Sequence, residues 1–411
     1  APAPTPRPPY RPRITTKEIV RIAGRGDGVT AEGRHVPFAA PGDRVDEAGA
    51  VVAAGPHHVT PSCRHFGICG GCQLQHVDDE AYRLFVRDRI VHALAAQRVE
   101  APAMADVHLS PPRTRRRAAL KAVRKDKRVR IGFNEAESHR LVAIEECPVL
   151  HPDLFALLDP LRGLLNRVLP ANGAASIGLT RCDQGMDVWI DRIAQNGAAI
   201  VTLSDFAQEH GLARLSVDFG YGLELVHAPQ PPTISFDTVP VALPPDAFLQ
   251  ATTDGESALV AAVMQVAEGA RRGLDLFAGL GTFALPLSGH MPVMAAEGWA
   301  AAVETLGQGA RAAGRPVAAK HRDLFRSPLD ASELSPFDFA VVDPPRAGAR
   351  AQTAELARSR LARIAMVSCN PSSFARDARA LIDGGYRLTR IWPVGQFRWS
   401  THVELAAAFE R

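Results

Sequence analysis

The sequence predicts a multidomain protein with a small OB-like β-barrel, an α+β central domain and a C-terminal α/β domain of the Rossmann type. A chain of 411 residues is too long for one ordinary hydrophobic core. Short Val/Ile runs between glycine-rich turns open the chain, and this spacing is typical of a small barrel. From Gly273 onward, buried strands alternate with helical segments, which indicates an open α/β sheet.

The predicted boundaries follow changes in composition. Ala1–Arg13 contains six prolines and few apolar side chains, so 1–13 is expected to be a flexible arm. The barrel is assigned to 14–58, the central domain to 59–249 and the α/β domain to 250–411.

Composition excludes several classes of protein. The sequence has no run of about 18 apolar residues and no leader-like pattern, so we expect a soluble, cytoplasmic protein without a membrane partner. A net charge of +3 identifies no partner by itself, and protein partners remain unknown. Six cysteines in 411 residues, some with a CxxC-like spacing, favour metal binding over a disulfide framework.

Four cysteines form a candidate ligand set. Three lie in the pattern Cys63-x5-Cys69-x2-Cys72, and Cys147 stands before a proline. Four thiolates suit either zinc or an iron–sulfur cluster. Cys182 has no such context and is expected to be a small buried apolar residue.

A strongly basic segment follows the first three cysteines. A helix is predicted near 82–97 and antiparallel strands across 115–144. From Arg113 to Arg130 there are ten Lys or Arg residues against one acid, Asp126. Such a field favours phosphate contacts and therefore nucleic acid. The alternative is an ordinary solvated strand face.

The C-terminal domain contains a candidate cofactor site. Apolar strands are predicted at 274–277, 293–296, 337–342 and 364–367. The first leads into a glycine turn, where a ligand can approach the backbone at the carboxyl end of a strand. Acids at later strand ends would lie at the same rim, and one of them could accept ribose hydroxyls. The pattern leaves a dinucleotide and S-adenosylmethionine as alternatives. The candidate residues are Gly279, Glu297, Asp323 and Asp343.

Cys369 and Glu404 are the candidate reactive residues. Cys369 follows a predicted strand in the segment Val367-Ser-Cys-Asn-Pro371, where a thiolate could be reached from a cofactor crevice. Glu404 begins an otherwise apolar final strand. A carboxylate there is costly unless it is paired or used, so it is a candidate general base.

These motifs resemble the RNA uracil-5-methyltransferase family, in particular its iron–sulfur branch that methylates bacterial 23S ribosomal RNA. The resemblance runs from about Lys17 to Glu404. It implies a TRAM barrel, a central domain with a [4Fe-4S] cluster held by Cys63, Cys69, Cys72 and Cys147, and a class I methyltransferase domain. RNA, with 23S ribosomal RNA first, would be the partner, and S-adenosyl-L-methionine the methyl donor.

The resemblance also implies individual roles. Cys369 would attack uracil C6, so that C5 accepts the methyl group, and Glu404 would remove the C5 proton. The sequence departs from the family at Ala278, Thr252 and the segment Phe397-Arg-Trp-Ser400, the last of which lies close to the base. The residues implied to contact the donor are Gln250, Phe277, Gly279, Thr282, Glu297, Asp323 and Asp343.

Two alternatives stay open. The same chemistry could act on tRNA, since the sequence reports the pocket better than the shape of the RNA. The chain could instead be a catalytically inactive iron–sulfur RNA-binding or assembly factor.

Overall fold

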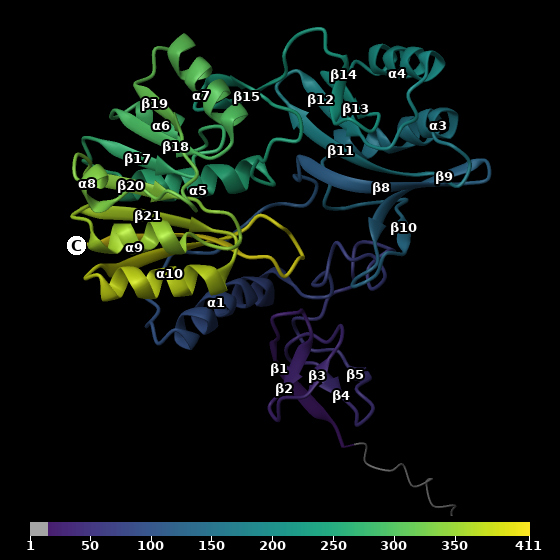
Figure 1. The fold of residues 1–411 in the computed structure, drawn as a ribbon. Coiled ribbons are helices and arrows are strands. Elements are labelled where there is room, and N and C mark those ends of the chain that lie inside the picture. The colour runs from purple at the N-terminus through teal and green to yellow at the C-terminus, as the bar shows by residue number, and fades with distance from the viewer. Residues whose placement is uncertain (1–14) are drawn as a thin grey trace, which may run out of the picture.

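The computed structural model describes residues 15–411 as three β-sheets, one extra hairpin and the helices that cover them (Figure 1). The predicted arm, 1–13, lies outside the described residues. No helix in the described part of the chain is long and apolar enough to span a membrane.

The N-terminal sheet has five short strands in the order β3-β2-β1-β4-β5. Its small core contains Ile19, Val36, Ala39 and Val45. This curved sheet is consistent with the predicted OB-like barrel. The strands are β1 Lys17–Ile22, β2 Gly28–Thr30, β3 His35–Val36, β4 Arg44–Val45 and β5 Val51–Ala53.

The central sheet has seven strands in the order β10-β9-β8-β11-β12-β13-β14. Buried residues alternate along β8, because one face packs against helices in a single core and the other does not. Its elements are β8 Arg117–Lys125, β9 Arg128–Asn134, β10 Leu141–Ala143, α2 Pro152–Ala156, α3 Leu158–Val168, β11 Ala174–Cys182, β12 Gly185–Ile190, α4 Gly197–Glu209, β13 Arg214–Asp218 and β14 Leu223–His227.

The C-terminal sheet has nine strands, with the main order β19-β18-β17-β20-β21-β23-β22-β6. Neighbours from β19 to β21 are parallel, and β23 is antiparallel to both β21 and β22. The strand order reverses beside β17, which is where open α/β sheets bind ligands. The strands are β17 Gly273–Leu276, β18 Val293–Glu297, β19 Val317–His321, β20 Phe339–Val342, β21 Arg363–Ser368, β22 Arg387–Gly395 and β23 Glu404–Glu410.

The four apolar strands predicted in this domain are confirmed as β17, β18, β20 and β21. Their almost continuous burial reflects helices on both faces of the sheet. The helices are α5 Thr253–Val266, α6 Ala284–Ser288, α7 Ala300–Ala312, α8 Ala331–Leu334, α9 Arg350–Arg358 and α10 Pro371–Asp383.

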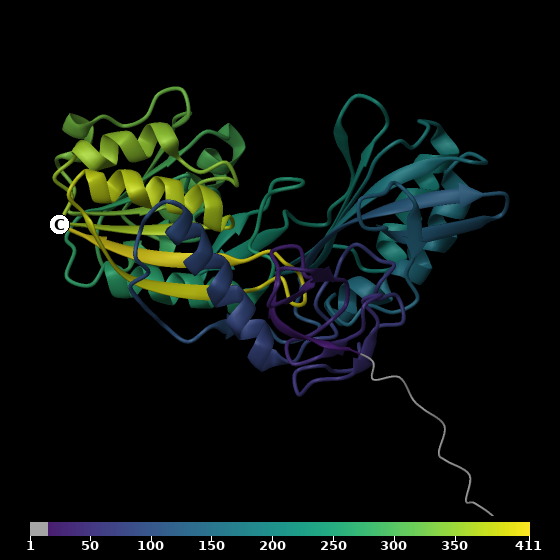
Figure 2. The same ribbon diagram turned by 90° about the horizontal axis from the view of Figure 1, so that it is seen from below.

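Two segments assigned by sequence to the central domain pack instead on the C-terminal sheet. Helix α1 (Asp79–Ala96) lies against α10 and β22 (Figure 2), and β6 (Ala103–Met104) and β7 (His108–Leu109) pair with β22. The hairpin of β15 (Thr233–Phe236) and β16 (Val239–Ala242) packs on α7. Residues 59–249 therefore do not form one continuous unit, because the apolar face of α1 finds its partner about 300 residues later.

Candidate functional site

The carboxyl ends of β17, β20 and β21 meet the start of β23 at one edge of the C-terminal sheet. Cys369 directly follows β21, and Glu404 is the first residue of β23. The antiparallel register pairs Ser368 with Leu405, so the next position along β21 brings Cys369 opposite Glu404. Strand pairing therefore places the two candidate reactive residues side by side.

Burial raises the pKa of both members of this pair. Glu404 is 3% exposed, and burial, with the nearby Asp343, raises its pKa to about 8. Burial also raises the pKa of Asp343 to about 7. The pKa of the Cys369 thiol is raised by burial and by the charges of Glu404 and Asp343, while Arg346 opposes the shift. Perturbed groups that gather in a cavity mark a candidate reactive site.

Gln396 links Glu404 to the neighbouring crevice, a role that sequence reasoning missed. Its Nε2 donates to Gln250 Oε1 at 2.6 Å, and its Oε1 accepts from the backbone of Ala251 at 2.9 Å. Hydrogen bonding from Gln396 also opposes the rise in the pKa of Glu404. Gln250 in turn donates to Asp343 at 3.5 Å. An isolated glutamine in a loop carries no sequence signal that could have revealed this bridge.

The glycine turn after β17 has the form expected of a ligand crevice. Gly281 has φ +99°, and a Cβ there would lie 2.5 Å from Leu306 Cδ1, so only glycine fits. The Glu297 carboxylate accepts from the backbone of Gly279 at 2.9 Å and of Trp299 at 2.8 Å. These bonds orient the carboxylate and leave lone pairs for a ligand. Thr282 lies in the same turn.

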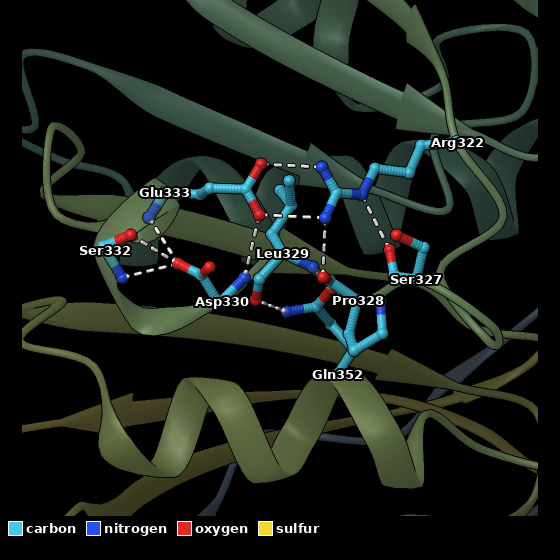
Figure 3. A network of polar contacts seen from close by, with 8 residues as sticks. All are labelled: Arg322, Ser327, Pro328, Leu329, Asp330, Ser332, Glu333 and Gln352. Atoms are coloured by element: carbon cyan, nitrogen blue, oxygen red, sulfur yellow. Dashed lines mark hydrogen bonds and ion pairs between the residues drawn. The ribbon is translucent and has the colours of Figure 1, made fainter.

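A polar network holds the loop that carries Asp323 (Figure 3). Arg322 pairs with both oxygens of Glu333 at 2.6 and 2.8 Å and donates to the carbonyls of Ser327 and Pro328. Bidentate pairs of this kind fix geometry. The loop also carries Phe325, whose ring lies 5.3 Å from that of Phe277. Phe277, which follows β17, thus lies close to the loop of Asp323, which follows β19.

The four candidate ligand cysteines gather in space. The loop of Cys63 is bound to the segment before Cys147, since Glu145 N donates to His65 Nε2 at 2.9 Å and Arg64 pairs with Glu145 at 3.1 Å. Burial raises the pKa of Cys72 to about 12, and the charges of the other three cysteines add to the rise. No three of the four sulfurs lie within 4.8 Å of one another. In a zinc tetrathiolate they would be about 3.8 Å apart, given a zinc–sulfur bond of about 2.3 Å.

One cavity of about 590 Å³ joins these cysteines to the reactive pair. Its lining includes all four, together with Cys369, Glu404, Arg115 and Arg346. The sequence had suggested two separate sites. Arg115 belongs to the basic segment, whereas its neighbour Arg116 forms a buried pair with Glu256 at 2.6 Å. Part of the basic segment therefore faces the cavity and part is structural.

The segment 396–403, which leads into Glu404, is held from two sides. The backbone N–H groups of Gln73 and Leu74, next to Cys72, both donate to the carbonyl of Trp399, at 2.8 and 2.9 Å. The buried Tyr82 hydroxyl lies 3.1 Å from the carbonyls of Phe397 and Ser400. The position of Glu404 thus depends on the cysteine loop and on α1.

Comparison with known proteins gives consistent results. A family model described as tRNA (Uracil-5-)-methyltransferase matches residues 317–411. An uncharacterized RNA methyltransferase of Zymomonas mobilis is 46% identical over 96% of this chain and all of its own length. The 23S rRNA (uracil(1939)-C(5))-methyltransferase RlmD of Halomonas elongata is 33% identical, over 93% of this chain and 86% of its own.

A solved structure resembles the whole arrangement. The Pyrococcus abyssi tRNA (uracil-54, C5)-methyltransferase in complex with S-adenosyl-L-homocysteine has a TM-score of 0.75 and 24% sequence identity, and the match covers 96% of this chain and 100% of that one. At this identity the likeness concerns the fold, which is that of a multidomain protein with a C-terminal methyltransferase-like α/β domain.

Proposed function

This chain belongs to the RNA uracil-5-methyltransferase family, and we propose that it transfers a methyl group from S-adenosyl-L-methionine to C5 of one uridine in 23S ribosomal RNA. The observation that carries the proposal is the pairing of Cys369 with Glu404 at the rim of a methyltransferase-like sheet. The relative named for 23S rRNA supports ribosomal RNA over tRNA. The presence of both Cys369 and Glu404 argues against the alternative, a catalytically inactive RNA-binding factor.

The proposed chemistry uses the thiol and the carboxylate in turn. The Cys369 sulfur, as the thiolate, adds to C6 of a uracil that has left its stack, and the electron pair of the C5–C6 double bond moves toward C5. That pair forms the new bond from C5 to the methyl group as the bond from the methyl group to the donor sulfur breaks, so the donor would leave as S-adenosylhomocysteine. Glu404 then removes the C5 proton, and the pair left behind expels the Cys369 thiolate. The pKa of Glu404, about 8, suits proton transfer near neutral pH.

The crevice residues fit the donor. Glu297 presents an oriented carboxylate for ribose hydroxyls, and the turn at Gly279 and Thr282 allows close approach. Gln250 donates to Asp343, whose charge acts on Cys369 and Glu404, and Phe277 lies close to the loop of Asp323. We assign donor contacts to these seven residues.

The cysteine set suits a [4Fe-4S] cluster. All four cysteines line one cavity, and ionised thiolates would be the ligands of the cluster. Cys63, Cys69, Cys72 and Cys147 would hold it. We assign the cluster a structural role in the part of the protein that binds RNA. We also assign the N-terminal barrel as a TRAM domain that contributes to RNA binding.

Deleting the gene should remove one 5-methyluridine from the ribosomal RNA of its host. Nucleoside mass spectrometry of separated 23S rRNA and tRNA, followed by fragment mapping, measures this loss. A loss confined to tRNA would show that tRNA, and not 23S rRNA, is the substrate. Unchanged nucleoside profiles in both 23S rRNA and tRNA would overturn the proposed function.

The catalytic efficiency should rise with pH through about 8. A general base acts only when deprotonated, and kcat/KM reports the pKa of the free enzyme, which is about 8 for Glu404. With an ordinary glutamate the rate would rise only with ionisation of Cys369, whose pKa is raised above its usual value, and no separate step near pH 8 would be seen. Methyl transfer measured from pH 6 to 9.5 tests this, and a profile without a step near pH 8 would contradict the assignment of Glu404.

A further inference from the structure

A second cavity, of about 230 Å³, adjoins the active-site cavity. The two share Arg115, Ala119, Phe248 and Phe397 in their lining. The second cavity lies on the face of the seven-stranded sheet opposite its helix-covered core. Pockets for drug-sized ligands usually measure about 300–1,000 Å³, so this one suits a smaller group.

Trp189 lies against the sheet in an unusual way. It pairs with Gly178 across β11 and β12, and a Cβ on Gly178 would be 1.9 Å from the indole Nε1. Glycine in the middle of a strand is costly and marks a close approach. Here it lets the indole cover the strand, with Trp189 also lining the cavity. The result is an aromatic surface supported from behind by the sheet.

Two arginines line the same cavity as Trp189, as do Thr180 and Asp246. Arg115 lies over the Phe397 ring at 5.2 Å, and Arg117 over the Phe248 ring at 5.8 Å. Arg117 also pairs with Asp246 at 3.2 Å, so Arg115 is the cation without a carboxylate partner among these contacts. Phe248 is 66% exposed. Aromatic faces interleaved with cations are what single-stranded RNA binding requires, because bases stack and phosphates need counter-charge.

We propose that the second cavity binds the base of a nucleotide next to the target uridine in the same RNA strand, stacked on Trp189. Because the two cavities share a wall, the nucleotide bound in the second cavity would be a neighbour of the reacting nucleotide. The proposal rests on the proposed function and adds a subsite that selects the RNA by its flanking base.

A cycle of protein and RNA changes tests the subsite. The probe is an oligonucleotide spanning the mapped uridine, together with versions in which each flanking nucleotide in turn is abasic. Trp189→Leu should weaken binding of the intact RNA by roughly 5- to 100-fold, and Trp189→Phe should retain most of the affinity. One of the abasic RNAs lacks the base that stacks on Trp189. For that RNA, the affinities of the wild type and of Trp189→Leu should differ by less than about 2-fold.

Controls separate the subsite from folding and from the function itself. Trp392→Leu makes the same change at a tryptophan that lines neither cavity and should leave RNA affinity unchanged. S-adenosylhomocysteine affinity reports that each variant is folded. The wild type could methylate the RNA while Trp189→Leu weakens binding of every abasic RNA as much as it weakens binding of the intact RNA. The subsite would then be wrong and the proposed function would stand. If the wild type methylates no RNA, the subsite and the proposed function are both wrong.

Discussion

Glu404→Gln should trap a covalent protein–RNA adduct through Cys369 and lower turnover by about 10²- to 10⁴-fold, the usual contribution of a general base. The amide cannot take the C5 proton, so elimination stops after addition. The substitution also removes a negative charge that raises the pKa of Cys369, and addition of the thiolate should therefore proceed. Labelled RNA that migrates with the protein on a denaturing gel measures the adduct.

A double variant provides the control. Cys369→Ser in the Glu404→Gln background should yield no adduct, because the weaker nucleophile cannot add to C6. An adduct that survives the loss of Cys369 would assign the nucleophile elsewhere. Rapid turnover by Glu404→Gln, with no adduct at any time, would remove Glu404 from the role of base.

Cys72→Ser should lower methyl transfer by at least about 10-fold, although Cys72 takes no part in the bond changes. The residues that follow it, Gln73 and Leu74, hold the carbonyl of Trp399, and Trp399 has φ +59°, a conformation that needs support. Loss of the proposed cluster would release the cysteine loop and, with it, the segment that places Glu404. Misplacement of about 1 Å can cost about 10² in rate.

Iron and sulfide content measured beside turnover checks this coupling. Cys72→Ser should lose iron and keep its affinity for S-adenosylhomocysteine, since most of the residues proposed to bind the donor stand at strand ends of the C-terminal sheet. Cys182→Ser is the matched control: Cys182 is buried and lines no part of the large cavity, so its iron content and turnover should stay at wild-type levels. Full turnover by an iron-free Cys72→Ser protein would show that the cluster does not position the base.

The strand ends of the C-terminal domain were predictable because their signals are local. Buried apolar runs mark parallel strands, and residues that follow such strands must meet at one edge. Glu297, Asp343 and Cys369 could therefore be predicted at one edge without a structure. In the structure each of them ends a strand or directly follows one, and the experiments above test their roles.

Other features had no local signal. Gln396 has polar neighbours only after β22 and the segment 250–251 come together. The attachment of α1 to the C-terminal sheet interrupts the central domain that the sequence predicted as the continuous range 59–249. In the sequence Trp189 is an ordinary residue of a predicted strand. The structure shows that its indole lies against Gly178 of the neighbouring strand.

The chemical groups of this protein and the strand ends on which they stand can be predicted from residue type and hydrophobic periodicity, because both act over a few neighbouring positions. The fold alone shows that Cys63, Cys69, Cys72 and Cys147 share a cavity with Cys369 and Glu404 near the end of the chain. That proximity depends on the packing of separate sheets and on hydrogen bonds between the loop of Cys72 and Trp399, and contacts between residues more than 300 positions apart leave no pattern in either segment alone.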